Sequence, residues 1–237
     1  MTSRLYLAPL ICACLTPAFA QGGPAGHWEG TLQLPDREIQ ITVDLAQDAK
    51  AGWIGALSQV SQGIRDVPLA DITVNEKSVK FRIVAGGANA PAFDCNLESA
   101  TSLHCTLTTP GGSIAATMKR TGEAKVELPK SNPAVSAEFE GDWEGIIDAP
   151  SGPLRITLHL KNQADKTVKA TLDSLDQNAM GLPLTDVVQK GSAIEFQLRL
   201  ANGGYKGALN KEATQLAGEW SQGGGSIALT LKKSPAK

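Results

Sequence analysis

Two serine-containing strings are the closest approach to a hydrolase nucleophile. They are Gly111-Gly112-Ser113-Ile114-Ala115 and Gly224-Gly225-Ser226-Ile227-Ala228. An α/β-hydrolase nucleophile sits in Gly-x-Ser-x-Gly, on a sharp turn from a strand into a helix. Both strings lack the final glycine, and each leads into a segment of alternating apolar and polar residues. We therefore interpret Ser113 and Ser226 as turn residues, and the sequence predicts no nucleophile of this kind.

Acid–base and metal-binding side chains are few. The three histidines, His27, His104 and His159, show no H-x-x-x-H or Cys/His ligand spacing, so no metal site is expected. Asp173 and Asp176 could form a carboxylate pair, but at the end of a strand their expected role is to bond the backbone of a turn. No phosphate-binding loop, dinucleotide fingerprint or EF-hand loop is present. The sequence predicts a protein without catalytic residues, metal or cofactor.

Residues 1–20 are typical of a cleavable signal peptide. Arg4 gives a basic start, an apolar stretch follows, and Ala18-Phe19-Ala20 is a small-residue cleavage site before Gln21. The stretch is too short to span a bilayer, which takes about 20 apolar residues. A retained anchor and a lipid-modified Cys14 are the alternatives. We expect cleavage after Ala20 and export to the periplasm or the medium.

The charge balance limits the class of partner. The chain carries 22 basic and 24 acidic residues, a formal charge of −2, and it loses Arg4 with the signal peptide. A mildly acidic chain is poorly suited to bind nucleic acid or an anionic membrane surface. No later segment is apolar enough to cross a bilayer. We expect neither a nucleic-acid-binding protein nor an integral membrane protein, and the oligomeric state stays open.

The chain contains two copies of one sequence unit. Gly26-His27-Trp28-Glu29-Gly30 matches Gly141-Asp142-Trp143-Glu144-Gly145 at an offset of 115, which holds over residues 26–83 with 15 identities in 58 positions. A fixed internal period is the mark of a repeat architecture. We assign repeat 1 to residues 24–120, a linker to 121–137 and repeat 2 to 138–234. Each repeat is large enough to be expected to fold independently.

Apolar and polar residues alternate within both copies. The first copy shows this from Ile39 to Leu45, and the second from Ile194 to Leu200. Such alternation is typical of half-buried antiparallel strands. In the second copy the strands are expected to begin near Asp142, Leu154, Thr167, Met180, Ala193, Gly204, Gln215 and Ser226. We predict an all-β protein of two tandem antiparallel up-and-down barrels, each with about eight strands.

Two cysteines remain once the signal peptide is removed, in a compartment where a disulfide persists. The segments around Cys95 and Cys105 align with those around Gly207 and Gly218. We expect these segments to be consecutive antiparallel strands with a turn near Ala100, which places Cys95 opposite Cys105. Opposed residues have Cβ atoms about 4.5 to 5.5 Å apart, near the separation that a disulfide needs. The sequence therefore predicts a Cys95–Cys105 disulfide.

Each copy opens with Gly-x-Trp, at Trp28 and Trp143, and its last strand ends in two basic residues, Lys119-Arg120 and Lys232-Lys233. This pattern resembles the lipocalins, which begin with Gly-x-Trp and place a basic residue over that tryptophan. The resemblance implies a lipocalin-like (calycin-like) barrel in which both tryptophans are structural.

The second copy also carries a longer string. It comprises Leu172-Asp173-Ser174-Leu175-Asp176-Gln177, Leu182-Pro183, Tyr205-x-Gly207-x-Leu209 and Leu216-x-Gly218-x-Trp220. The string resembles the β-rich module that precedes the hydrolase domain in secreted bacterial α/β-hydrolases of the serine aminopeptidase type. The first copy keeps Gln62, the counterpart of Gln177, but has Ser58 and Ser61 in place of the two aspartates. The resemblance implies an accessory role rather than catalysis.

Two functions remain open. An eight-stranded barrel can hold one small ligand, and Gly207 and Gly218 are expected to leave space that the cysteines fill in the first copy. A pocket for a small apolar ligand is then expected beside Phe196, Tyr205 and Trp220, unless these side chains are simply the core. The alternative is a protein–protein interaction or scaffold module that acts with a separate exported hydrolase or envelope protein. An interior cavity favours the first function, and an exposed apolar patch favours the second.

Overall fold

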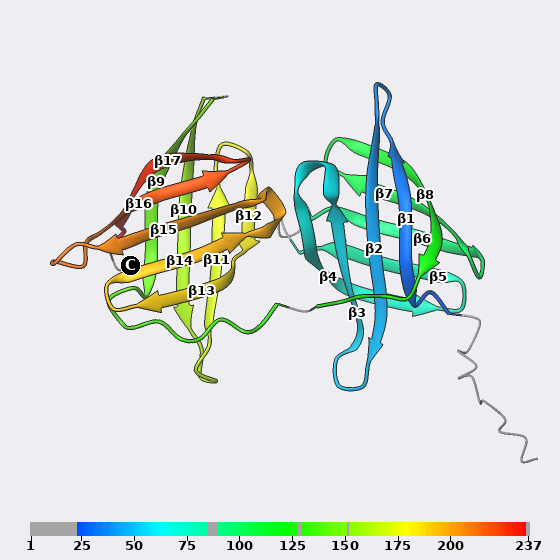
Figure 1. The fold of residues 1–237 in the computed structure, drawn as a ribbon, viewed down its shortest axis with the longest axis horizontal. Helices are drawn as coiled ribbons and strands as arrows, with labels where there is room; N and C mark the ends of the chain where they lie inside the picture. The colour runs from blue at the N-terminus through cyan, green and yellow to red at the C-terminus, as the bar shows by residue number, and fades with distance from the viewer. Residues whose placement is uncertain (1–22, 85–89, 128, 151, 236–237) are drawn as a thin grey trace, which may run out of the picture.

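The computed structural model describes residues 23–84, 90–127, 129–150 and 152–235. The predicted signal peptide, residues 1–20, and its cleavage site lie outside the described residues. The rest of the chain forms two all-β units side by side, joined by an extended segment (Figure 1). In the part that the structure describes, no helix is long and apolar enough to cross a membrane.

The first unit is a closed antiparallel barrel in which each strand pairs with the next and the last pairs with the first. Its strands are β1 (Gly26–Gln33), β2 (Glu38–Asp48), β3 (Gly52–Gln59), β4 (Ile64–Asn75), β5 (Ser78–Ile83), β6 (Ala92–Ser99), β7 (Ser102–Thr109) and β8 (Gly112–Gly122). A short 3-10 helix, η1 (Val60–Gln62), joins β3 to β4. Closure leaves no strand edge exposed along the barrel.

The second unit repeats this topology with one strand broken. Its strands are β9 (Gly141–Ala149), β10 (Gly152–Asn162), β11 (Val168–Ser174), β12 (Ala179–Pro183), β13 (Thr185–Lys190), β14 (Ala193–Leu198), β15 (Gly203–Leu209), β16 (Gln215–Gln222) and β17 (Gly225–Lys233), with η3 (Arg199–Ala201) between β14 and β15. β12 and β13 together take the place of β4 and are interrupted at Leu184. The predicted all-β fold of two tandem barrels is confirmed, and the eight predicted strand starts fall within two residues of observed ones.

Each barrel encloses its own apolar core, as alternation along the strands requires. On β2, Ile41, Val43 and Leu45 are buried in the first core, and on β10 Leu158 and Leu160 are buried in the second. The predicted disulfide is confirmed as well: residues 95 and 105 are direct partners on β6 and β7, and their sulfur atoms are bonded inside the first barrel.

The tryptophan of each Gly-x-Trp motif is buried and makes the same two kinds of contact in both barrels. Trp28 is fully buried, its indole N–H donates to the Pro24 carbonyl at 2.8 Å, and the Arg120 guanidinium lies 4.9 Å from the ring centroid. In the second barrel the Trp143 indole N–H donates to the Phe139 carbonyl at 2.8 Å, and the Lys233 ammonium lies 5.1 Å from the ring centroid. A basic group over the tryptophan, as the lipocalin resemblance implies, is therefore present in both copies.

Both ends of the predicted linker, residues 121–137, contact the barrels. β8 extends to Gly122, and Asn132 and Val135 belong to the second barrel. The Asn132 side chain donates to the Leu184 carbonyl at 2.9 Å and accepts from the Val187 N–H at 3.0 Å. These bonds satisfy backbone groups where β12 gives way to β13. The sequence does not reveal this role, because a single Asn in a proline-containing segment forms no hydrophobic pattern that would mark it as part of a barrel.

Candidate functional site

A groove lies on the outer face of each barrel, over its first strand and the two neighbours of that strand. Groove one crosses β8, β1 and β2, and groove two crosses β17, β9 and β10. The two are lined at equivalent positions: Glu29, Thr31, Gln40, Thr42, Val60 and Lys119 in groove one, and Glu144, Ile146, Arg155, Thr157, Leu175 and Lys232 in groove two. Their volumes are about 320 and 690 Å³, so groove two is the larger.

Strand pairing places the polar lining residues side by side. Glu144 on β9 pairs with Thr157 on β10 and with Lys232 on β17, and the first barrel repeats both pairings. Gly145 lets these strands approach closely, because a Cβ there would lie 2.6 Å from the Leu231 Cδ2 atom. A carboxylate, a hydroxyl and an ammonium group therefore share one face of both barrels.

Exposed apolar side chains complete the grooves. Ile146 and Leu175 in groove two are 53 % and 43 % exposed, and Val60 in groove one is 52 % exposed. Leu175 lies in the turn between β11 and β12, and Val60 lies in η1, the equivalent turn of the first copy. Apolar side chains grouped on the surface and rimmed by polar ones are typical of interaction sites.

The turn that carries Leu175 is bound to β10. The Leu175 N–H donates to the Arg155 carbonyl at 2.9 Å, and Asp176 accepts from the Arg155 backbone N–H at 2.7 Å and from its guanidinium at 2.6 Å. The hydrogen bond from the Arg155 side chain lowers the pKa of Asp176, which keeps this carboxylate ionised. Asp176 does bond a backbone N–H, but on the neighbouring strand β10 rather than in its own turn as predicted, and its carboxylate holds one wall of groove two.

A polar row borders groove two on the same face. Asp142, His159 and Asp173, on β9, β10 and β11, are joined by hydrogen bonds of 2.7 and 3.0 Å through the two ring nitrogens of His159. The sequence analysis did not predict this row. One feature of the sequence could have indicated it: His27 aligns with Asp142, and Asp44 aligns with His159. Such an exchange of histidine and aspartate between copies is typical of two residues that pair across neighbouring strands.

The predicted pocket in the second barrel is occupied by protein. Phe196, Tyr205 and Trp220 are at most 3 % exposed, and a Cβ on Gly207 would clash with the Tyr205 hydroxyl. That hydroxyl donates to the Leu216 carbonyl at 3.0 Å, and burial raises the pKa of Tyr205, so the proton stays in place. The expectation of empty space beside Gly207 and Gly218 is wrong. Tyr205 stands where the first copy has Phe93, and its hydroxyl fills the space at Gly207, while the Lys206 carbonyl fills the space at Gly218.

The remaining candidate residues lie apart from one another. Ser113 and Ser226 are exposed at the starts of β8 and β17, in hairpins as predicted, and Ser226 donates to Glu219. Gln62 and Gln177 are exposed in the two equivalent turns, where Gln177 accepts from Ser174 at 2.8 Å. Among the described residues no group of three His, Cys, Asp or Glu side chains is arranged to hold a metal ion.

Comparison with known proteins finds no family and only distant structural similarity. No protein family and no curated protein matches the sequence. Among solved structures, a protein of unknown function from the DUF3598 family of Nostoc punctiforme PCC 73102 is 12 % identical, with a TM-score of 0.29, over 89 % of this chain and 96 % of that one. A putative outer membrane protein of Bacteroides fragilis NCTC 9343 is also 12 % identical, with a TM-score of 0.28, over 89 % and 97 %.

Proposed function

We propose that the protein is a non-catalytic, exported interaction module that binds an extended segment of another exported protein through grooves one and two. The observation that carries this proposal is the repetition of one exterior groove in both barrels. Glu, Thr and Lys recur at equivalent positions, and an exposed apolar side chain recurs in the equivalent turn.

A small apolar ligand inside a barrel has less support. The predicted interior site is filled by Tyr205, Phe196 and Trp220, whereas Ile146 and Leu175 are exposed on the outside. An exposed apolar patch, rather than an interior space, is the feature that favours an interaction module.

Because the two grooves are in one chain, a partner with two extended segments can bind both at once. Once one segment is bound, the tether raises the effective concentration of the second groove, which strengthens weak individual contacts. The resemblance to modules that precede secreted hydrolases makes a separate exported hydrolase one class of partner. The disulfide within the first barrel supports an oxidising, exported setting.

Site-specific crosslinking in the native envelope tests the proposal. A photoreactive residue is placed at Ile146 in groove two, at Thr31 in groove one, or at Val188, which is 39 % exposed on β13 and lies in neither groove. We expect the same exported protein to be captured from positions 146 and 31 and not from 188. Replacing Leu175 with Lys should reduce capture at 146.

Two outcomes would contradict the proposal. One is equal capture from all three positions. The other is a small apolar molecule retained by the purified protein in native mass spectrometry and unaffected by Leu175→Lys, which would return the function to the barrel interior.

A further inference from the structure

The row beside groove two consists of one histidine between two carboxylates. His159 Nδ1 lies 2.7 Å from Asp142 Oδ1, and Nε2 lies 3.0 Å from Asp173 Oδ2. The His159 side chain is one-third exposed. Asp142 and Asp173 differ sharply, since their side chains are 54 % and 14 % exposed.

The protonation state of the His159 ring decides whether both contacts can be hydrogen bonds. An ionised carboxylate only accepts, and a neutral imidazole has one N–H donor, so His159 can donate to both aspartates only as imidazolium. Partial burial by itself lowers the pKa of His159, but the hydrogen bonds and the attraction of Asp142 and Asp173 outweigh it and raise the pKa.

We infer that His159 is a proton-dependent bridge on the outer face of the second barrel. When protonated, it ties β9 and β11 to β10; when it loses a proton, it keeps Asp173 and releases Asp142 into water. Asp173 is the one retained because it is nearly buried and its other oxygen accepts from the Gly181 N–H at 2.6 Å. Asp142 is released because water can replace His159 at an exposed carboxylate with little loss.

The first copy contains the same row without the bridge. Its members are His27, Asp44 and Ser58 on β1, β2 and β3, so the histidine stands at the end and the third position has no charge. Ser58 still accepts the N–H of Asp66, as Asp173 accepts that of Gly181. His27 makes one hydrogen bond, of 2.9 Å to Asp44, which a neutral ring can donate; its Nε2 atom lies 3.6 Å from the Glu29 carboxylate, beyond hydrogen-bond distance. The bridge is therefore confined to the second barrel.

Other charged groups line the same hollow. Glu140 precedes β9 and accepts from Asn162, while Lys161 on β10 and Lys169 on β11 lie farther along their strands. Along β9 in the other direction, Glu144 accepts from Ser234. These groups set the background field, and the two aspartates contact the ring directly.

The sign of the effect on stability follows from the raised pKa. A group whose pKa is higher in the folded state contributes stability below its unfolded pKa, about 6.5 for histidine. That contribution is lost as the pH rises through the folded pKa. The charge of the row then falls from −1 to −2. If groove two binds a partner as proposed above, this change acts at one end of the bound segment.

Nuclear magnetic resonance of the unbound protein tests the bridge without reference to any partner. Across about pH 5 to 9, the His159 ring nitrogens should titrate with a midpoint above about 6.5. Above that midpoint the Nε2–H tautomer should dominate. The Asp142 carboxyl signal should move with the same midpoint, while the Gly181 amide should not. An Nδ1–H tautomer accompanied by movement of the Gly181 amide would overturn the inference, as would a midpoint at or below the ordinary value.

Three substitutions separate the bridge from a merely structural role. Asp142→Asn should lower the His159 midpoint, and so should Asp173→Ser, which installs the residue type of the first copy and keeps an acceptor for Gly181. Glu144→Gln is the matched control, because it removes a carboxylate from the same face of β9 that does not contact the ring, and it should leave the midpoint in place. Equal shifts in all three variants would show a general field effect and overturn the inference.

Discussion

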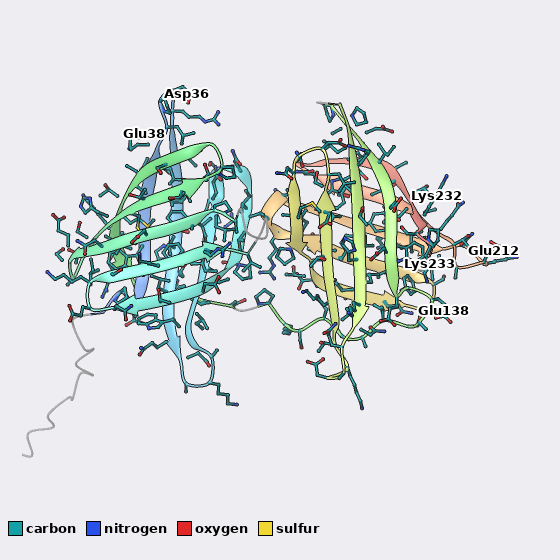
Figure 2. The ribbon with its side chains drawn as sticks, turned by 180° about the vertical axis from the view of Figure 1, so that it is seen from behind. Asp36, Glu38, Glu138, Glu212, Lys232 and Lys233 are labelled. Atoms are coloured by element: carbon teal, nitrogen blue, oxygen red, sulfur yellow. A yellow bond between two sulfur atoms is a disulfide. The ribbon has the colours of Figure 1, made fainter. Side chains whose placement is uncertain are left out.

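At the scale of single residues, the basic group over each tryptophan is the most regular feature of this protein. Lys233 contacts the Trp143 ring, and its ammonium also donates to the Glu138 carbonyl at 2.7 Å. Figure 2 shows Lys232, Lys233 and Glu138 on the side of the second barrel turned away from the first. Neighbouring lysines thus have different roles, because strand alternation turns Lys233 toward the tryptophan and Lys232 toward groove two.

We expect Lys233→Met to destabilise the second barrel by about 1 to 2 kcal/mol, through loss of the cation–π contact and of one hydrogen bond. Methionine retains most of the apolar stem, so the change tests the charge rather than the packing. Calorimetric unfolding measures the effect, with Lys232→Met as the matched control. Equal losses in the two variants would show that Lys233 acts only through net charge.

At the scale of elements, one hairpin position is filled in two different ways. The first barrel places a disulfide between β6 and β7. The second places Gly207 and Gly218 opposite each other on β15 and β16; the Tyr205 hydroxyl lies against Gly207, and backbone atoms of β15 lie against Gly218. A covalent link and a buried hydroxyl are thus alternative ways to occupy the same part of a barrel interior.

This comparison predicts how a second disulfide can be installed. Gly207→Cys with Gly218→Cys should leave free thiols or a destabilised barrel, because Tyr205 occupies the space. Adding Tyr205→Phe, which reproduces the first copy, removes the contact at Gly207 and should raise the yield of the bridge. A Cβ on Gly218 would still clash with the Lys206 carbonyl oxygen, so β15 and β16 must also move apart to admit it. Thiol titration of the native protein measures the outcome. A bridge that forms equally well with Tyr205 present would contradict this account of the space.

At the scale of the whole molecule, the two barrels differ in how far they are self-contained. The strands β1 to β8 close on themselves, and the segment that follows them is held by a hydrogen bond from the Lys125 backbone N–H to the Asp44 carboxylate at 2.8 Å. The second barrel recruits part of the preceding segment: Val168 and Val187 donate backbone N–H groups to Asn132, and Val135 is 6 % exposed within the second core. We therefore expect the boundary between the folding units to lie before Asn132.

Fragments that begin on either side of this boundary should behave differently. Residues 129–237 should unfold cooperatively, whereas residues 137–237 should be less stable by at least about 3 kcal/mol, from lost hydrogen bonds and lost apolar burial. Thermal unfolding of both fragments measures the difference. In the full chain, Asn132→Ala should destabilise the second barrel and the adjacent, exposed Ser131→Ala should not. Equal stability of the two fragments would place the boundary back at residue 137.

The sequence by itself determined the repeat, the alternating strands and the pairing of Cys95 with Cys105. Each of these depends on local spacing: period two fixes which side chains face inward, and a short hairpin fixes which residues are opposed. Only the tertiary structure decided that Tyr205 fills the expected pocket, that Asn132 belongs to the second barrel, and that His159 lies between two aspartates. Those facts depend on how side chains from distant strands share space and protons, and a spacing pattern along one chain does not contain that information. The two grooves, too, were found only in the tertiary structure. The sequence shows that a residue points outward, but it does not show whether neighbouring strands bring other side chains beside it to form a binding surface.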